Sequence, residues 1–125
     1  MIHDEICTYE VAKLAREKGF NVQTFDWYDY TGNYNKGFIP HKLHECPRYK
    51  EYYAPTQGLL QRWLREEKNI HIAVFPNLRN SYEYDWIVYI KGEECWLPTY
   101  SALNDFDTYE LALEDALKYA LENLV

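Results

Sequence analysis

The chain has 125 residues, enough for one domain with one core, and its 47% hydrophobic and 26% charged residues are typical of a folded globular protein. The net charge of −7 argues against non-specific binding to nucleic acid or to an anionic membrane surface. No run of about 18 apolar residues occurs, and the first residues include acids instead of an apolar segment. We therefore expect a cytoplasmic protein without a transmembrane helix, in which the odd set of cysteines (Cys7, Cys46, Cys95) stays as free thiols.

The N-terminal part begins with a predicted helix over residues 9–18, capped by Thr8 and ended by Gly19, with Phe20 packing back onto it. Alternating aromatic and acidic residues predict a strand over about 22–30. A turn signal at 31–33 and a weak hairpin return over 34–39 follow. Residues 40–54 show no clean period, so we expect a loop or connector there.

The stretch after residue 55 predicts a helix that leads directly into a strand. Four large apolar residues share one helical stripe, and Thr56 is a plausible N-cap beside Pro55 (Leu59, Leu60, Trp63, Leu64). Lys68 and Asn69 favour the end of the helix, because Asn tolerates the left-handed conformation. Ile70, Ile72 and Val74 then alternate with less apolar residues, which indicates a strand that ends at Pro76.

Two further strands and a helix complete the predicted order. Residues 82–91 alternate clearly, and residues 94–97 form a short third strand that Pro98 stops. The last helix starts with Asp107 as N-cap, Glu110 three residues later, and an apolar staple between Phe106 and Leu111. Its apolar stripe runs to the chain end (Leu113, Ala116, Leu117, Ala120, Leu121, Leu124).

This order predicts an α+β fold: a small antiparallel sheet of three to five strands, with helices mainly on one face and the order α-β-β-β-α from residue 55 on. We expect a single domain in which residues 1–54 pack on the unit formed by 55–125. The second face of the sheet would stay apolar unless the N-terminal residues cover it. The alternative is that the chain forms a two-fold dimer through that face.

Three segments resemble a family of small uncharacterised proteins of Bacteroides-type bacteria and their prophages. They read TYEVAKLAREKGF at 8–20, APTQGLLQRWLREEKNIHI at 54–72 and DTYELALEDALKYAL at 107–121. This resemblance implies a phage or mobile-element context and no particular activity.

The order helix-strand-strand-strand-helix also resembles the double-stranded-RNA-binding domain, and its last part is similar to the HicB antitoxin family. RNA-binding members carry Lys at the start of the final helix, whereas this chain has Asp105, Asp107 and Glu110 there. Because those carboxylates repel phosphate, the resemblance implies the shape without the RNA activity.

One cluster is typical of a metal site: His41, His44 and Cys46. Imidazole and thiolate are good zinc ligands, but a structural zinc needs a fourth ligand, which Cys95 or His71 would have to supply from elsewhere. A metal-dependent or thiol enzyme built on this cluster is one hypothesis for function. The simpler interpretation is two solvated histidines and a half-buried cysteine, with no cofactor.

The excess of aromatic residues indicates an interaction surface, since Tyr and Trp dominate interface hot spots. The predicted surface consists of Trp27, Tyr28, Tyr30, Tyr34, Tyr49, Tyr52 and Tyr53. The alternative is that about half of these rings fill the core.

Charge is unevenly distributed, with a net +3 over residues 36–68 and a net −5 over residues 105–125. A basic patch for nucleic acid is therefore a third hypothesis, although the overall charge disfavours it (Lys36, Lys42, Arg48, Lys50, Arg62, Arg65). No catalytic motif occurs. The sequence favours a non-enzymatic protein-interaction module that binds a protein partner or itself, as a homodimer.

Overall fold

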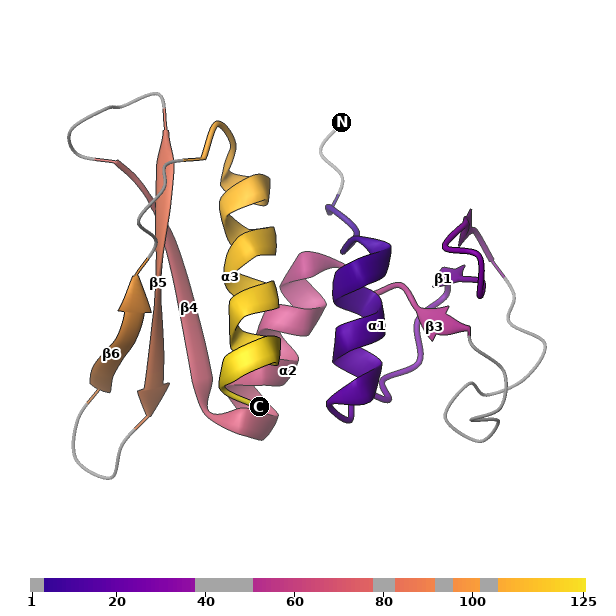
Figure 1. Ribbon diagram of the computed structural model, residues 1–125, viewed down its shortest axis with the longest axis horizontal. Coiled ribbons are helices and arrows are strands. Elements are labelled where there is room, and N and C mark those ends of the chain that lie inside the picture. Colours follow the sequence, from indigo (N-terminus) through magenta and orange to yellow (C-terminus); the bar gives the residue numbers. More distant parts are fainter. Residues whose placement is uncertain (1–3, 38–50, 78–82, 92–95, 102–105) are drawn as a thin grey trace.

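The computed structural model describes residues 4–37, 51–77, 83–91 and 106–125, and the backbone of residues 96–101. The described chain forms two antiparallel sheets with helices between them, which confirms the α+β class. Figure 1 shows the layers in order: the larger sheet, then α3 and α2, then α1, then the small sheet.

The larger sheet and two helices form the predicted α-β-β-β-α unit. Its elements are α2 (Gln57–Lys68), β4 (Ile70–Pro76), β5 (Tyr84–Lys91), β6 (Trp96–Ser101) and α3 (Tyr109–Asn123). The strand order is β4-β5-β6 and every pair is antiparallel. Both helices lie on one face of this sheet, as predicted (Figure 1).

The core of the unit lies between that face and the helices. Ile72 pairs with Val88 and Val74 with Trp86, so these alternate residues point to the helix side. Trp86 and Val88 are fully buried against the apolar stripe of α3. The buried residues of that stripe are Leu113, Ala116, Leu117, Ala120 and Leu121, and the predicted stripe is confirmed over them.

The predicted caps of the first two helices are confirmed. Helix α1 (Tyr9–Glu17) begins after Thr8, whose hydroxyl accepts from the Val11 N–H at 3.3 Å. Thr56 accepts from the Leu59 N–H at 3.1 Å and caps α2 in the same way. Each hydroxyl satisfies a backbone donor that has no partner inside its helix.

The predicted ends of these helices are also confirmed. Gly19 has a φ of 101°, and the Phe20 N–H donates to the Ala15 carbonyl at 2.9 Å, which closes α1 with a Schellman turn. Asn69 ends α2 in the left-handed conformation with a φ of 57°. The chain therefore turns sharply from α2 into β4.

The predicted start of the last helix is wrong by one residue. Thr108, and not Asp107, is the N-cap, because its hydroxyl accepts from the Leu111 N–H at 3.1 Å. Leu111 is 54% exposed. Phe106 exchanges two backbone hydrogen bonds with Tyr84, at 2.7 and 2.9 Å.

The predicted end of the third strand is also wrong, because β6 continues through Pro98 to Ser101. Pro98 lies opposite Tyr89, next to a register shift between Val88 and Tyr89. β6 is an edge strand, and both an edge and a bulge accept a residue that lacks an N–H.

The N-terminal part differs most from the prediction. The strand expected over 22–30 is only β1 (Trp27–Tyr28), and its hairpin return is only β2 (Tyr34–Asn35). The expected connector contains a third strand, β3 (Tyr52–Tyr53), which pairs with the other side of β1. Residues 40–50 of that connector lie outside the described residues.

The small sheet packs on α1, and α1 packs on α3. The described N-terminal elements therefore lie on the helix side of the α-β-β-β-α unit (Figure 1). None of these described elements covers the opposite face of the larger sheet, so that predicted cover is wrong for this part of the chain.

Candidate interaction surfaces

The predicted metal cluster of His41, His44 and Cys46 lies outside the described residues, as does Tyr49. In the described ranges, no three His, Cys, Asp or Glu side chains come close enough together to hold a metal ion. Zinc binding by the cluster stays a prediction. Cys7 is described, and it is a fully buried free thiol.

The structure divides the predicted aromatic surface into buried and exposed rings. Tyr28, Tyr52 and Tyr53 are buried, with exposed fractions of 8%, 7% and 5%. Trp27 is half-buried against the main core. Tyr30 and Tyr34 remain exposed, at 72% and 38%. The rings therefore do not form one continuous exposed surface, which corrects that expectation for the described residues.

The buried tyrosines attach the small sheet to α1. The Tyr9 ring meets the edges of Tyr28 and Tyr52 with centroid distances of 5.6 and 5.7 Å. The Tyr28 hydroxyl donates to the Cys7 carbonyl at 2.6 Å, and the Arg16 guanidinium lies 5.5 Å above the Tyr52 ring. Burial raises the pKa of Tyr28, so its phenol remains a donor at neutral pH.

Two aspartates shape the turns of the small sheet. Asp29 accepts from the Thr31 hydroxyl and from the backbone N–H groups of Thr31 and Asn33, at 2.9 and 3.0 Å for the N–H groups. These bonds, that of the Thr31 hydroxyl first, lower the pKa of Asp29. Asp26 accepts from the Tyr34 hydroxyl and from the Gly37 N–H. Both carboxylates therefore act in local structure.

The predicted basic patch is only partly described. Lys36 and Arg65 are exposed, and Arg62 forms an exposed ion pair with Glu66 at 3.0 Å. Lys42, Arg48 and Lys50 lie outside the described residues. Nucleic-acid binding through this patch stays a prediction.

The outer face of the larger sheet, on the side away from the helices, carries apolar and aromatic side chains. Its cross-strand pairs are His71 with Tyr89, Ala73 with Ile87, and Phe75 with Asp85. Ala73 and Phe75 are exposed, Phe75 at 38%, and the other four are half-buried. We call these six residues the outer face.

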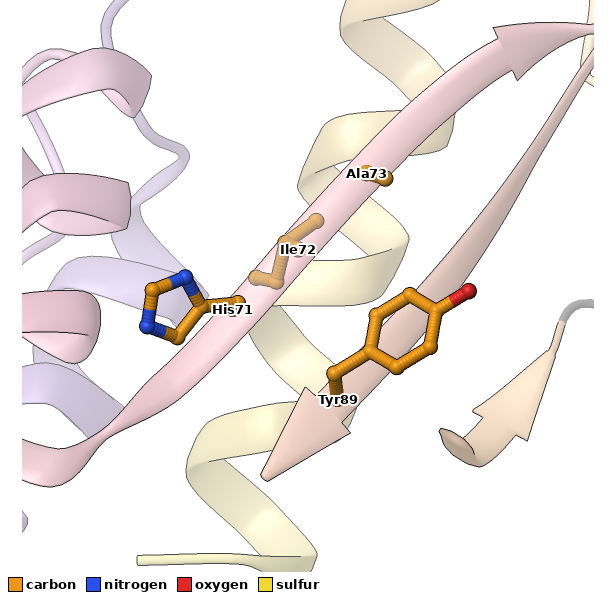
Figure 2. A pocket seen from close by; sticks show the side chains of 4 residues that line it. All are labelled: His71, Ile72, Ala73 and Tyr89. Atoms are coloured by element: carbon orange, nitrogen blue, oxygen red, sulfur yellow. The ribbon is translucent and has the colours of Figure 1, made fainter. Parts of the chain in front are cut away.

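A shallow pocket of about 340 Å³ is lined by His71, Ala73 and Tyr89 of this face and by Ile72, whose side chain points to the helix side. Figure 2 shows the Tyr89 ring on β5 and the His71 imidazole on neighbouring β4. Burial, then the positive charges of Arg65 and Lys91, lower the pKa of His71. The imidazole is therefore neutral at pH 7 and suited to contact with an uncharged or aromatic group.

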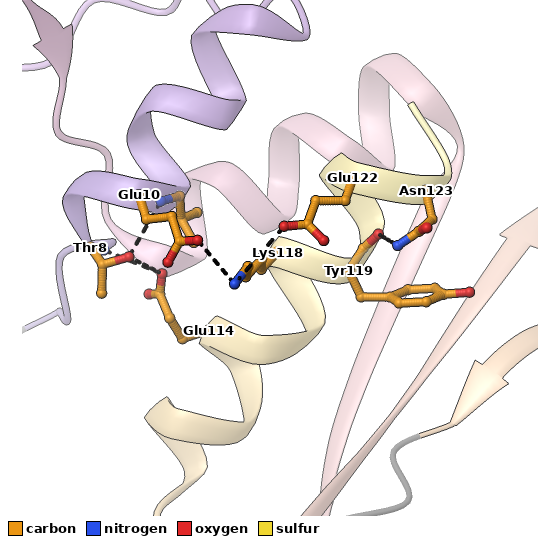
Figure 3. A network of polar contacts seen from close by, with 8 residues as sticks. Thr8, Glu10, Glu114, Lys118, Tyr119, Glu122 and Asn123 are labelled. Carbon is orange, nitrogen blue, oxygen red and sulfur yellow. Dashed lines mark hydrogen bonds and ion pairs between the residues drawn. The ribbon is translucent and has the colours of Figure 1, made fainter.

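A polar junction joins the three helices near their first turns. The Glu114 carboxylate accepts from the Thr8 N–H and hydroxyl at 3.2 and 3.1 Å, and from Gln57 Nε2 at 3.0 Å. Lys118, one turn later, pairs with Glu10 on α1 at 3.0 Å (Figure 3). The junction fixes α1 against α3 with partners 106 residues apart in sequence. The sequence gives no local signal for these contacts.

Sequence alone also missed the burial of Gln57. Its exposed fraction is 4%, although glutamine is usually a surface residue. The position directly after a threonine cap, on the side of α2 that faces α3, explains this burial.

Each helix in the described part of the chain is too short or too polar to cross a bilayer. No protein-family model, curated protein or solved structure matches this chain. The resemblance to the Bacteroides-type family, to the double-stranded-RNA-binding domain and to HicB therefore stays a prediction.

Proposed function

We propose that the protein is a non-enzymatic interaction module that self-associates as a two-fold dimer through the outer face. The observation that carries this proposal is the set of exposed and half-buried apolar side chains on the outer face (Ala73, Phe75, Ile87, Tyr89). They lie opposite the face that the helices and the described N-terminal elements cover.

The composition of the outer face suits contact with a second copy. The pair of Ala73 and Ile87 lies at its centre, and the small alanine allows another sheet to approach closely. Two packed sheets lie about 10 Å apart and interdigitate their side chains. Phe75 on one side and Tyr89 on the other would fill the space around the alanine.

Charges at the two ends of β5 favour an antiparallel arrangement of the copies. Asp85 lies near the start of this strand and Lys91 at its end. A two-fold axis perpendicular to the strands brings the Asp85 end of one copy to the Lys91 end of the other. Opposite charges at the rim of the contact would favour this orientation over others, but they would add little to the affinity of the dimer.

The proposed biological context is that of an accessory protein of a phage or mobile element. It rests on the resemblance of residues 8–20, 54–72 and 107–121 alone. Self-association can be tested without that context, because it concerns the outer face only.

Light scattering over a concentration series tests the dimer. We expect the mass to rise from that of one 15.1 kDa chain toward twice that value in the micromolar range. An Ala73→Glu variant puts a charge at the centre of the face and should stay at the mass of one chain. The matched control is Phe25→Glu, which changes a residue that is 76% exposed near the small sheet.

Near-ultraviolet circular dichroism shows whether each variant keeps its packed aromatic residues. A wild-type mass that stays at 15.1 kDa into the high-micromolar range would rule out the stable dimer. Equal dimerisation of wild type and a folded Ala73→Glu variant would place the contact on another surface.

A further inference from the structure

A second surface, distinct from the outer face, lies along the first turns of α3. Two adjoining hollows of about 400 and 260 Å³ lie between the segment before α1, the start of α2 and the start of α3, and a third of about 250 Å³ lies between the start of α1 and α3. The first two share Glu5, Gln57 and Glu110, and the first and third share Leu111 and Glu114. Because they share walls, they form one groove.

Carboxylates dominate the polar lining of this groove. Among the described residues that line it, six are carboxylates and one is a cation, Lys118, which already pairs with Glu10 at 3.0 Å. We call it the acidic groove, and its carboxylates are Asp4, Glu5, Glu10, Glu110, Glu114 and Asp115.

Half of these carboxylates already have a structural partner. Glu10 pairs with Lys118, Glu114 accepts from Gln57, and Asp115 accepts from the Trp86 indole at 2.9 Å. The other three line the hollow of about 260 Å³ and are exposed (Asp4, Glu5, Glu110). Their side chains make no hydrogen bond or ion pair with the described residues.

Gln57 supplies an observation that does not depend on these charges. It is 96% buried, and its Nε2 donates to the Glu110 carbonyl at 2.9 Å and to Glu114 Oε1 at 3.0 Å. Both partners only accept, so the amide cannot be turned around. Its Oε1 receives no hydrogen bond from the described residues, and Gln57 lines two of the hollows. The groove therefore offers a fixed acceptor to an incoming donor.

Exposed apolar side chains lie next to this acceptor. Leu111 is 54% exposed and lines two of the hollows, and Tyr109 is 41% exposed and lines the one with the unpaired carboxylates. A tyrosine ring beside carboxylates is a good contact for a guanidinium or ammonium group. Leu111 offers a contact for the next apolar side chain of the same ligand.

We propose that the acidic groove binds a basic, extended segment of a partner protein. A Lys or Arg side chain of that segment donates to Gln57 Oε1 between Asp4, Glu5 and Glu110, and a neighbouring apolar side chain packs on Leu111. The described carboxylates are too far apart to hold a metal ion, but their spacing suits several cationic side chains of one extended segment. Their charge excludes phosphate-bearing ligands such as nucleic acid.

Fluorescence anisotropy with a dye-labelled nonapeptide of alternating Lys and Leu tests the groove. We expect saturable binding at low salt that weakens as salt is added, because exposed charges are screened. The same peptide with Glu in place of Lys should not bind. Replacing its Leu by Ser should weaken binding about tenfold, the effect of losing one buried apolar contact.

Variants of the protein locate the binding. We expect Glu110→Lys and Leu111→Ser each to weaken binding about tenfold. The matched control is Glu67→Lys, which makes the same charge change on an exposed residue of α2 outside the groove. Far-ultraviolet circular dichroism confirms that each variant is folded.

Two results would overturn the proposal. One is the absence of saturable binding by wild type at low salt. The other is an equal loss of peptide affinity in Glu67→Lys and Glu110→Lys. That result would mean that binding depends on the net charge of −7 and not on the acidic groove. The Ala73→Glu variant should bind the peptide as wild type does, so failure of the dimer and failure of the groove are told apart.

Discussion

The two halves of this chain are stabilised by different interactions. In the α-β-β-β-α unit, strands of seven, eight and six residues pair along their length, and β4 and β5 bury alternate apolar side chains under two helices. In the N-terminal part, each of three strands has two residues. Tyrosine contacts and hydrogen bonds from aspartate side chains hold those short strands in place.

This difference shows how little regular structure a region needs once polar side chains fix its turns. A two-residue strand pair supplies few backbone hydrogen bonds and is not stable alone. Here the Asp29 turn and the ring contacts of Tyr9, Tyr28 and Tyr52 add the missing constraints. We therefore expect stability to depend on apolar volume in the α-β-β-β-α unit. In the N-terminal part we expect it to depend on turn geometry and on the protonated tyrosine hydroxyls.

The largest effect should come from the core of the α-β-β-β-α unit. Trp86 is 1% exposed and packs against α3. We expect Trp86→Ala to lower the free energy of unfolding by about 3–5 kcal/mol, because the removed ring leaves a cavity that the sheet cannot close. Urea denaturation followed by circular dichroism measures this change.

The same experiment tests whether the halves unfold together. A single transition in wild type, and a lower midpoint without a new intermediate in Trp86→Ala, would mean that the N-terminal part depends on the unit. A loss below about 1 kcal/mol would contradict the central place of Trp86 in the core.

The same contrast explains how much of the fold could be predicted from sequence. Alternation predicted that Trp86 and Val88 share one side of their strand, and the structure shows that this side faces the helices. The threonines before α1 and α2 marked both helix starts. Long periodic segments are easier to predict, because every apolar residue at the expected spacing supports the same helix or strand assignment. The choice between two neighbouring candidates for one position was predicted wrongly: Thr108, and not Asp107, is the N-cap of α3.

The strands of the N-terminal part were harder to predict from sequence, because they are too short to show a periodic pattern of apolar residues. Two residues, such as Tyr52 and Tyr53, cannot show alternation, so β3 was expected to be connector. The aromatic count suggested that about half of the predicted rings fill the core, but not which ones. Tyr28 is buried and Tyr30 exposed because of the turn that Asp29 makes, and only the structure shows this.

The candidate surfaces differ in the same way. An uncovered second side of the sheet was expected, because alternation leaves a second side to β4 and β5. The acidic groove was not foreseen, because it depends on Gln57 and Glu114, which meet across 57 positions of sequence. A buried glutamine between two helices has no sequence pattern of its own.

A matched pair of glycine substitutions tests the Asp29 turn and should give the second-largest effect. Gly32, in the Asp29 turn, has a φ of +87°, and an added Cβ would lie 3.4 Å from the Tyr9 ring. We expect Gly32→Ala to cost about 1–2 kcal/mol, because a side chain destabilises the left-handed conformation. The free energy of unfolding in urea measures the loss.

Gly58, near the start of α2, is the control. An added Cβ there has no neighbour within 4 Å and no positive φ to oppose it. Gly58→Ala should raise the free energy of unfolding by about 0.4–1 kcal/mol, because alanine is the better helix former. Equal effects at the two glycines would mean that the Asp29 turn is not a fixed element of the fold.

The smallest effect should come from the tyrosines of the small sheet at alkaline pH. Burial, and then the hydrogen bond to Asp26, raise the pKa of Tyr34 from 10.0 to about 12. Burial also raises the pKa of Tyr28. Between pH 10 and about 12 the unfolded chain loses the phenol proton of Tyr34 while the folded chain keeps it. The free energy of unfolding therefore falls as pH rises through this window, and the contribution of Tyr34 is complete below pH 10. Because Tyr34 is 38% exposed, solvent screens much of the effect.

Urea denaturation at several pH values across this window, with tyrosinate absorbance as a second signal, measures the slope. Tyr34→Phe should be less stable than wild type at neutral pH, because it loses the hydrogen bond to Asp26, and its stability should fall less steeply with pH. Tyr30→Phe, which removes a phenol that is 72% exposed in the same turn, is the matched control. A Tyr34→Phe variant with the wild-type slope would show that the phenol of Tyr34 is not held in the folded state. In that case the N-terminal part would depend on its ring contacts alone and not on phenol hydrogen bonds.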